Sequence, residues 1–143
     1  MRLFLMTATA AGFAFATAIM MADEAAAVQD TPTTINGIET VCTGVGSAKD
    51  DPRWKDYPVK IVLATTGGAN LANAHVSLTK DGKKVAGLDC DAPWILFRPL
   101  AGSYTATATL IGGSGSAHAS FTTSSSGQKE VTLLFPRSEA PTQ

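Results

Sequence analysis

The sequence predicts an all-β protein: a single antiparallel β-sandwich of seven to eight strands, preceded by a signal-peptide helix. Three observations predict this fold. Short segments of alternating apolar and polar residues follow one another, and turn residues separate them about every 8–12 residues. No amphipathic helical pattern appears after the N-terminal apolar run. The length of 143 residues suits one domain and is short for two.

The N-terminus has the layout of a secretory signal peptide. It begins with a Met-Arg pair, continues as an apolar run over residues 3–22, and has three alanines at residues 25–27. These small residues fit cleavage after Ala27, with a cut after Ala22 as the alternative. The run is long enough for an uncleaved anchor, but its many alanines and threonines make it only moderately hydrophobic. We therefore expect a secreted, periplasmic protein.

The sequence divides into four parts: a signal peptide (1–27), a flexible lead-in (28–34), a β-sandwich domain (35–136) and a polar tail (137–143). Cleavage after residue 27 leaves ten basic and ten acidic residues. A chain with no net charge and no basic cluster lacks the electrostatic footprint of nucleic-acid binding or of anionic-lipid binding. We expect no nucleic-acid partner and, after signal cleavage, no membrane partner.

Cys42 and Cys90 are the only two cysteines. Behind a signal peptide, such an isolated pair predicts one structural disulfide. The bond would close a loop of about 49 residues and contribute ~4 kcal/mol in the chain-entropy model. The pair has no Cys-x-x-Cys spacing, so a redox role is not indicated. Two free, buried cysteines are the alternative.

The first half of the domain contains a strand, a charged loop and a second strand. Residues 35–45 are rich in β-branched side chains and are interrupted by Gly37 and Gly44. Residues 46–57 form a polar loop with several charged side chains. Residues 59–65 alternate, present one strongly apolar face, and end before a Gly-Gly pair.

The middle of the domain carries a hairpin signal. Residues 74–80 and 83–88 both have a β pattern, and Asp81-Gly82 joins them. A type I′ turn needs positive φ at both central positions, which Asp and Gly tolerate. The two segments are therefore predicted to pair as antiparallel neighbours.

Four further strands complete the predicted sandwich. Residues 93–97 are short and heavily apolar, and residues 103–110 show the clearest alternation in the chain. Residues 116–122 and 128–135 alternate again, with polar turns around them. The side chains predicted to form the core are Ile61, Leu63, Val76, Leu78, Ile95, Phe97, Tyr104, Ala106, Ala108, Phe121, Val131, Leu133 and Phe135.

Two of these segments resemble a known family, the carboxypeptidase regulatory-like or transthyretin-like β-sandwich. The hairpin AHVSLTKDGKKVAGL is similar to its strand, Asp-Gly turn, strand element, and PWILFRPLAGSYTATATL is similar to its L-x-P-G-x-Y-x-V-x-A signature. Tyr104 after Gly102 takes the place of the family's core tyrosine, whereas Leu100-Ala101 departs from its Pro-Gly turn. The resemblance covers roughly residues 57–135. The stretch INGIETVCTGVGSAKDDPRW also resembles small secreted proteobacterial proteins, which implies the fold and the compartment and no activity.

The residues that carry chemistry in other proteins do not form a motif here. His75 and His118 fall in predicted strands on the face opposite the apolar residues, and no carboxylate or cysteine stands at ligand spacing to either. We interpret them as two unrelated exposed side chains. Asp50, Asp51 and Asp56 lack EF-hand spacing and lie among basic residues, which indicates a solvated, self-paired loop. We expect no catalytic residue, no cofactor and no metal.

The resemblance includes an enzyme branch, the transthyretin-related hydrolases of the urate pathway. They use a His/Arg set and a C-terminal Tyr-Arg-Gly-Ser, whereas this chain ends in Ser-Glu-Ala-Pro-Thr-Gln. We therefore do not expect that activity.

The two tryptophans are the remaining candidates for ligand contact. Trp94 lies four residues after Cys90 and is expected to pack on the disulfide or in the core. Trp54 lies in the charged loop and is the better candidate ligand contact, although loop tryptophans also fold back as lids.

The expected function is that of a non-catalytic binding or structural module. A protein or an envelope polymer is the expected partner, because sandwiches of this class offer sheet edges and loops for docking. The alternative is a small periplasmic hydrolase or metal-dependent enzyme without a recognisable motif. Fold alone does not choose between these functions, and a concave pocket that holds a histidine would favour the enzyme.

Overall fold

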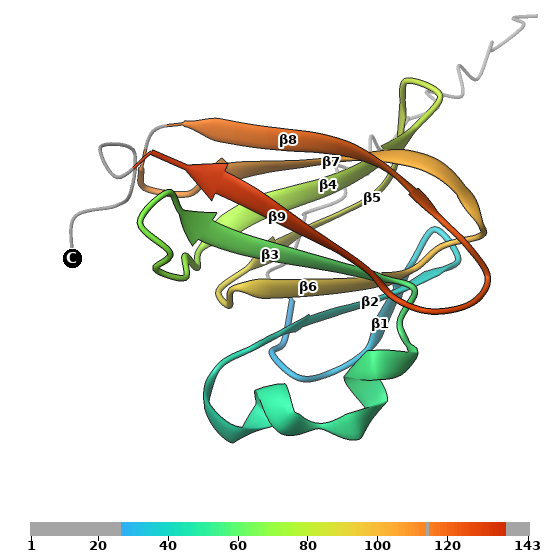
Figure 1. Cartoon of the computed structure of the whole chain (residues 1–143), viewed down its shortest axis with the longest axis horizontal. Coiled ribbons are helices and arrows are strands. Elements are labelled where there is room, and N and C mark those ends of the chain that lie inside the picture. Colours follow the sequence, from blue (N-terminus) through green and yellow to red (C-terminus); the bar gives the residue numbers. More distant parts are fainter. Residues whose placement is uncertain (1–26, 114, 137–143) are drawn as a thin grey trace, which may run out of the picture.

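The computed structural model describes residues 27–113 and 115–136, and in this part of the chain nine strands form two facing sheets (Figure 1). The predicted all-β sandwich is confirmed, with more strands than the seven to eight expected. All neighbouring strands pair antiparallel except β3 and β9, which run parallel. The expected signal peptide and polar tail lie outside the described residues, apart from Ala27. No helix in the described part is long and apolar enough to cross a membrane.

The two sheets have the strand orders β1-β2-β6-β3-β9 and β5-β4-β7-β8. The five-stranded sheet contains β1 (Thr33–Ile35), β2 (Ile38–Thr43), β6 (Trp94–Arg98), β3 (Val59–Thr65) and β9 (Lys129–Phe135). The four-stranded sheet contains β5 (Lys83–Cys90), β4 (Ala74–Lys80), β7 (Gly102–Leu110) and β8 (Ser116–Thr123).

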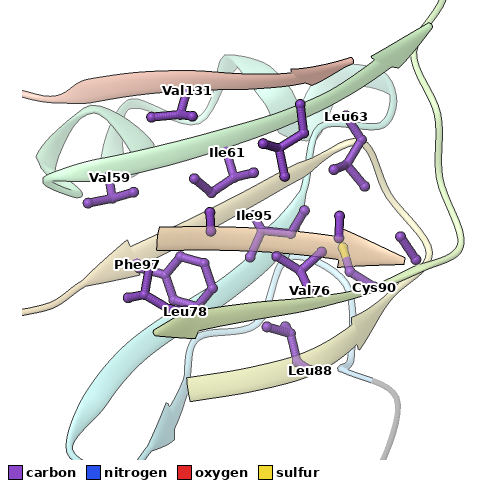
Figure 2. Packing of buried hydrophobic residues seen from close by; sticks show 14 of the residues in the cluster. Val59, Ile61, Leu63, Val76, Leu78, Leu88, Cys90, Ile95, Phe97 and Val131 are labelled. Carbon is purple, nitrogen blue, oxygen red and sulfur yellow. The ribbon is translucent and has the colours of Figure 1, made fainter. Parts of the chain in front are cut away.

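The core lies between the sheets, where the inward side chains of both meet (Figure 2). The period of two along each strand sends alternate residues inward, so the apolar positions read from the sequence share one face. All the predicted core residues are buried: Ile61, Leu63, Val76, Leu78, Ile95, Phe97, Tyr104, Ala106, Ala108, Phe121, Val131, Leu133 and Phe135.

A disulfide joins the two sheets through this core. Cys42 in β2 and Cys90 at the end of β5 are bonded, and their Cα atoms are 5.6 Å apart. Both residues are buried. The predicted pairing is therefore confirmed, and its Cα separation lies within the usual range for a disulfide.

The predicted hairpin at Asp81-Gly82 is also confirmed. The two residues have φ angles of 51° and 76°, as a two-residue turn with positive φ requires. Lys80 and Lys83 stand directly opposite each other at the base of this turn. The register then shifts by one residue between Leu78 and Thr79, where β5 carries a bulge.

The start of the domain differs from the prediction. The segment 35–45 was expected to be one strand, but Asn36-Gly37, with φ angles of 49° and 79°, turns the chain between β1 and β2. The sheet begins at Thr33, inside the segment expected as a flexible lead-in. Asp30, in the same segment, is hydrogen-bonded to β2. Its N–H donates to Cys42 O (2.8 Å), and its carboxylate accepts from Thr43 Oγ1 (2.6 Å).

The charged loop folds into two short 3₁₀ helices, η1 (Gly46–Asp50) and η2 (Pro52–Asp56), which lie against the outer face of the five-stranded sheet (Figure 1). Proline suits the first turn of η2, where its missing N–H costs nothing. The Asp51 carboxylate accepts a hydrogen bond from the Arg53 N–H (2.9 Å) and so caps the helix. A second hydrophobic cluster forms beneath these helices: Val41, Trp54, Tyr57 and Leu96.

Candidate functional site

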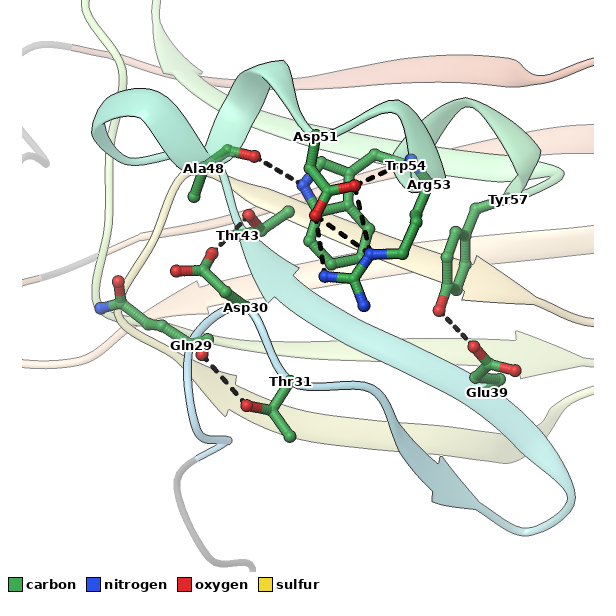
Figure 3. A network of polar contacts seen from close by, with 10 residues as sticks. All are labelled: Gln29, Asp30, Thr31, Glu39, Thr43, Ala48, Asp51, Arg53, Trp54 and Tyr57. Atoms are coloured by element: carbon green, nitrogen blue, oxygen red, sulfur yellow. Dashed lines mark hydrogen bonds and ion pairs between the residues drawn. The ribbon is translucent and has the colours of Figure 1, made fainter.

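Trp54, the predicted ligand contact, lies in η2 and faces the five-stranded sheet (Figure 3). Only 4% of its surface is exposed. Its Nε1 donates to the carbonyl of Ala48 (2.7 Å), and its ring centre is 6.1 Å from that of Tyr57. Trp54 therefore anchors the helical segment to the sheet, as a lid residue would.

Trp54 also lines a cavity of about 300 Å³ between the helical segment and the sheet. Trp94, Lys60 and Asp51 line it as well, so the cavity carries charges of both signs. The Nζ of Lys60 lies 3.5 Å from the centre of the Trp94 ring, a cation–π contact. The role of Trp54 as a ligand contact stays a prediction.

Trp94 does not lie where the sequence led us to expect it. It is half-buried, belongs to neither hydrophobic cluster, and packs against Gly44 on the outer side of the five-stranded sheet. The reason is the alternation along β6: Ile95 takes the inward position that faces the disulfide-bearing core, so Trp94 points outward.

Of the three acidic residues in the loop, Asp51 pairs locally with Arg53. Arg53 binds the Asp51 carboxylate in a bidentate manner, with Nη2–Oδ2 at 2.7 Å and Nε–Oδ1 at 3.1 Å (Figure 3). Hydrogen bonds from Arg53 lower the pKa of Asp51. Over residues 27–113 and 115–136, no group of three or more His, Cys, Asp or Glu side chains is arranged to hold a metal ion.

Tyr57, Glu39 and Arg98 form a polar cluster at the edge of η2. The Tyr57 hydroxyl donates to the Glu39 carboxylate (Figure 3), and the Arg98 Nε lies 3.8 Å from the other oxygen of Glu39. The Arg98 guanidinium also lies 4.6 Å from the centre of the Tyr57 ring. The pKa of Tyr57 is raised to about 12. Burial is the largest cause, and the hydrogen bond to Glu39 is the second. This cluster ties η2 to β2 and β6.

The two histidines have different surroundings and lie on strands that are not neighbours, as expected for unrelated residues, but the interpretation of His75 as an exposed side chain is wrong. Its Nδ1 lies 2.7 Å from Asp89 Oδ1 on the neighbouring strand, and its Nε2 lies 3.4 Å from Lys84 Nζ. The side chain is half-buried. His118 is exposed in β8, and β7 separates it from the strand of His75. The sequence did not indicate Asp89 as a partner of His75, because the two residues are 14 positions apart and meet only when β4 and β5 pair.

One end of the sandwich carries the β1–β2 turn, the β4–β5 hairpin and the β6–β7 connection (Figure 1). Residues in and beside these segments line a groove. We call it the end groove, and its volume is about 610 Å³. Its apolar lining consists of Ile38, Val85, Pro99, Leu100 and Tyr104. Its basic lining consists of Lys80, Lys83, Lys84 and Arg98. The remaining lining residues, Asn36 and Gly37, are uncharged, so no acidic residue of the described chain lines it.

Tyr104 organises the floor of the end groove. Its ring is buried, and its hydroxyl donates to the carbonyl of Leu100 (2.7 Å), which fixes the β6–β7 connection. The Leu100 side chain is 83% exposed. Leu100 therefore adds exposed apolar area beside the concave surface of the groove. The sequence indicated the core role of Tyr104, but residues from three distant segments form the groove.

Comparison with known proteins finds similarity in structure and none in sequence. No protein-family model matches the chain, and no curated protein sequence matches it. Among solved structures, the chain is similar to the 5-hydroxyisourate hydrolase of Klebsiella pneumoniae, with a TM-score of 0.43 and 18% sequence identity. The match covers 58% of this chain and 87% of that chain.

Proposed function

We propose that this protein is a non-catalytic binding module of the carboxypeptidase regulatory-like type, and that its ligand binds in the end groove. The groove itself is the observation that supports this function. Ligand sites are typically concave, mostly apolar and furnished with a few convergent polar groups, with volumes of about 300–1,000 Å³. The end groove has each of these properties.

The disulfide supports a location outside the cytoplasm. Cys42 and Cys90 are bonded and buried between the sheets, and such bonds persist in the periplasm and in secreted proteins. The N-terminal signal-peptide layout points the same way. Both observations support the proposal that the binding module acts in the periplasm or outside the cell.

The partner class expected from the sequence was a protein or an envelope polymer. The volume of the end groove favours a smaller ligand, or one small group of a larger partner. Leu100 on the rim and Tyr104 on the floor would contact its apolar part.

The enzyme alternative depends on the pair formed by His75 and Asp89. A carboxylate at 2.7 Å from Nδ1 is the arrangement that orients a histidine for proton transfer. A metal-dependent enzyme would carry stoichiometric metal in elemental analysis of the purified protein, and would lose it in a His75→Ala/His118→Ala double variant. Our proposal expects no stoichiometric metal, and its detection would promote the alternative.

An uncharged, environment-sensitive dye such as Nile red tests the groove. We expect its fluorescence to rise on binding to the wild-type protein, and to fall back towards the free-dye level with Leu100→Gln, because the exposed apolar contact is lost. Leu134→Gln is the matched control: Leu134 is 54% exposed and lies on β9, outside the groove. Equal loss in both variants, or no binding to the wild type, would contradict the proposed function.

A further inference from the structure

We infer that the end groove takes a single-chain amphiphilic anion, a medium-chain fatty acid. Its hydrocarbon chain would lie along Ile38, Val85 and Leu100, and its carboxylate would lie between Lys80 and Lys83. This inference deepens the proposed function and rests on it. It is carried by the distribution of charge around the apolar lining.

The lining of the end groove is more positively charged than the chain as a whole. The whole chain has a formal net charge of −1, yet four of its 11 basic residues line this one groove with no acidic residue among the lining. Asp81, in the adjacent turn, instead lines a separate hollow on the outer face of the four-stranded sheet. An apolar surface bordered by cations complements an apolar molecule that ends in an anion.

Two of the four basic residues have other contacts. Arg98 lies 3.8 Å from Glu39 Oε2 and donates to the carbonyl of Asp56 (3.0 Å). Lys84 reaches His75 on the outer face of the four-stranded sheet. Lys80 and Lys83 form no ion pair with a carboxylate of the described residues within 4.0 Å. These two ammonium groups are therefore the best placed to receive an anion.

The register of the hairpin brings the two lysines together at a cost. Lys80 and Lys83 are direct cross-strand partners at the base of the Asp81-Gly82 turn. Like charges in directly opposite positions destabilise a pair of strands. A bound carboxylate would relieve this repulsion and would accept hydrogen bonds from both ammonium groups.

Packing holds Lys80 at the groove. Its Nζ lies 5.3 Å from the centre of the Tyr104 ring, a cation–π contact. A Cβ at Gly102 would stand 3.2 Å from this Nζ, so the absence of a side chain there leaves room for the ammonium group. The charge is thus positioned by an aromatic ring and a glycine, and both lie beside the apolar lining.

The shape of the site favours a single molecule over a membrane surface. The apolar residues line a concavity of about 610 Å³, in which Tyr104 is buried and Ile38 and Val85 are half-buried. A protein that lies on a membrane instead inserts protruding apolar side chains among the lipids. Among the apolar lining residues of the groove, only Leu100 is exposed, and the other four are buried or half-buried.

Calorimetric titration with octanoate, decanoate and laurate, each below its micelle concentration, tests the inference. We expect the dissociation constant to fall by up to about four-fold for each added methylene, because each one buries apolar area. Laurate should bind at least ten-fold more tightly than dodecyltrimethylammonium, and its affinity should decrease with salt. Equal affinity for the cationic and anionic amphiphiles would overturn the inference and leave the proposed function standing.

Variants identify the residues that hold the carboxylate. We expect the Lys80→Gln/Lys83→Gln double variant to weaken laurate binding by about ten-fold, as loss of two partly screened charge contacts predicts, and to leave dodecanol binding unchanged. Lys129→Gln on β9 removes one positive charge outside the groove and should have no effect. Unchanged laurate affinity in the double variant would overturn the inference.

Two further outcomes separate the inference from the proposed function. If the protein sediments with phosphatidylglycerol vesicles but does not bind monomeric laurate, the groove faces a membrane and the inference is wrong. If neither laurate nor Nile red binds the wild-type protein, the proposed function fails as well.

Discussion

The backbone of Gly44 lies directly against the indole of Trp94. A Cβ placed on Gly44 would stand 2.7 Å from Cγ of Trp94, closer than side chains approach each other. Gly44 also has a φ of +106°, which L residues rarely adopt. The residue follows β2 immediately, so this contact sets the direction in which the chain leaves the sheet for η1.

We predict that Gly44→Ala destabilises the protein by about 1–3 kcal/mol, because the substitution adds both backbone strain and a clash with Trp94. Gly127→Ala is the control, since Gly127 has a φ of +77° and no atom lies within 4 Å of the position that a Cβ would take there. It therefore reports strain alone. Urea denaturation of both variants gives the difference, and equal losses would show that the Trp94 contact costs nothing.

A second prediction concerns Tyr57 at alkaline pH. Its folded-state pKa of about 12 lies above the ordinary value of 10.0, because burial and the hydrogen bond to Glu39 favour the protonated phenol. The associated stability is fully present below pH 10 and is lost as the pH rises towards 12. Tyr57→Phe should remove this pH dependence of the unfolding free energy. A variant with the wild-type alkaline profile would contradict the assignment.

A third prediction concerns the disulfide between the sheets. Loss of Cys42–Cys90 in a Cys42→Ala/Cys90→Ala variant should cost about 2–5 kcal/mol, chiefly because the unfolded chain regains freedom. Dithiothreitol should lower the denaturation midpoint of the wild-type protein and leave that of the variant unchanged. Two thiols that react with an alkylating reagent in protein purified without reductant would show that the bond does not form.

A fourth prediction concerns the core between the sheets. Leu78 has 0% exposure, so Leu78→Ala should cost about 2–5 kcal/mol through lost burial and the cavity left behind. Leu134 sits on the outer face of β9 with 54% exposure, and Leu134→Ala should change stability by no more than about 0.5 kcal/mol. Similar midpoints for the two variants would mean that the assigned inward face of β4 is incorrect.

The residue pattern by itself determined the strands and the side of each that faces the core. Alternation is a local signal: once a segment is extended, successive side chains must point to opposite faces. The Asp81-Gly82 turn is likewise local, because positive φ at two residues is a property of those residues. Asn36-Gly37 carries the same signal, and it was missed because β1 has only three residues to mark a strand before it.

The pairing of His75 with Asp89 needed the tertiary structure. A regular hairpin closed by Lys80 and Lys83 would place His75 opposite Leu88. The apolar residues of β4 and those of β5 would then face opposite sides of the sheet. The bulge after Leu78 shifts the register by one residue and brings the two apolar faces together, which sets His75 opposite Asp89. Burial of the core, and not local preference, makes this choice.

The end groove also depends on the tertiary structure alone. Ile38 and Lys83 begin strands β2 and β5, and Leu100 lies between β6 and β7. These three residues are far apart in the sequence, and each is unremarkable in its own segment. They meet because the two sheets pack with their turns at the same end of the sandwich (Figure 1). The sequence determined the strands, the core and the disulfide, since these follow from local periodicity and from a single pair of cysteines. The packing of one sheet on the other decided where apolar and basic side chains converge. These side chains belong to segments that are distant in the sequence, so only the folded arrangement brings them together.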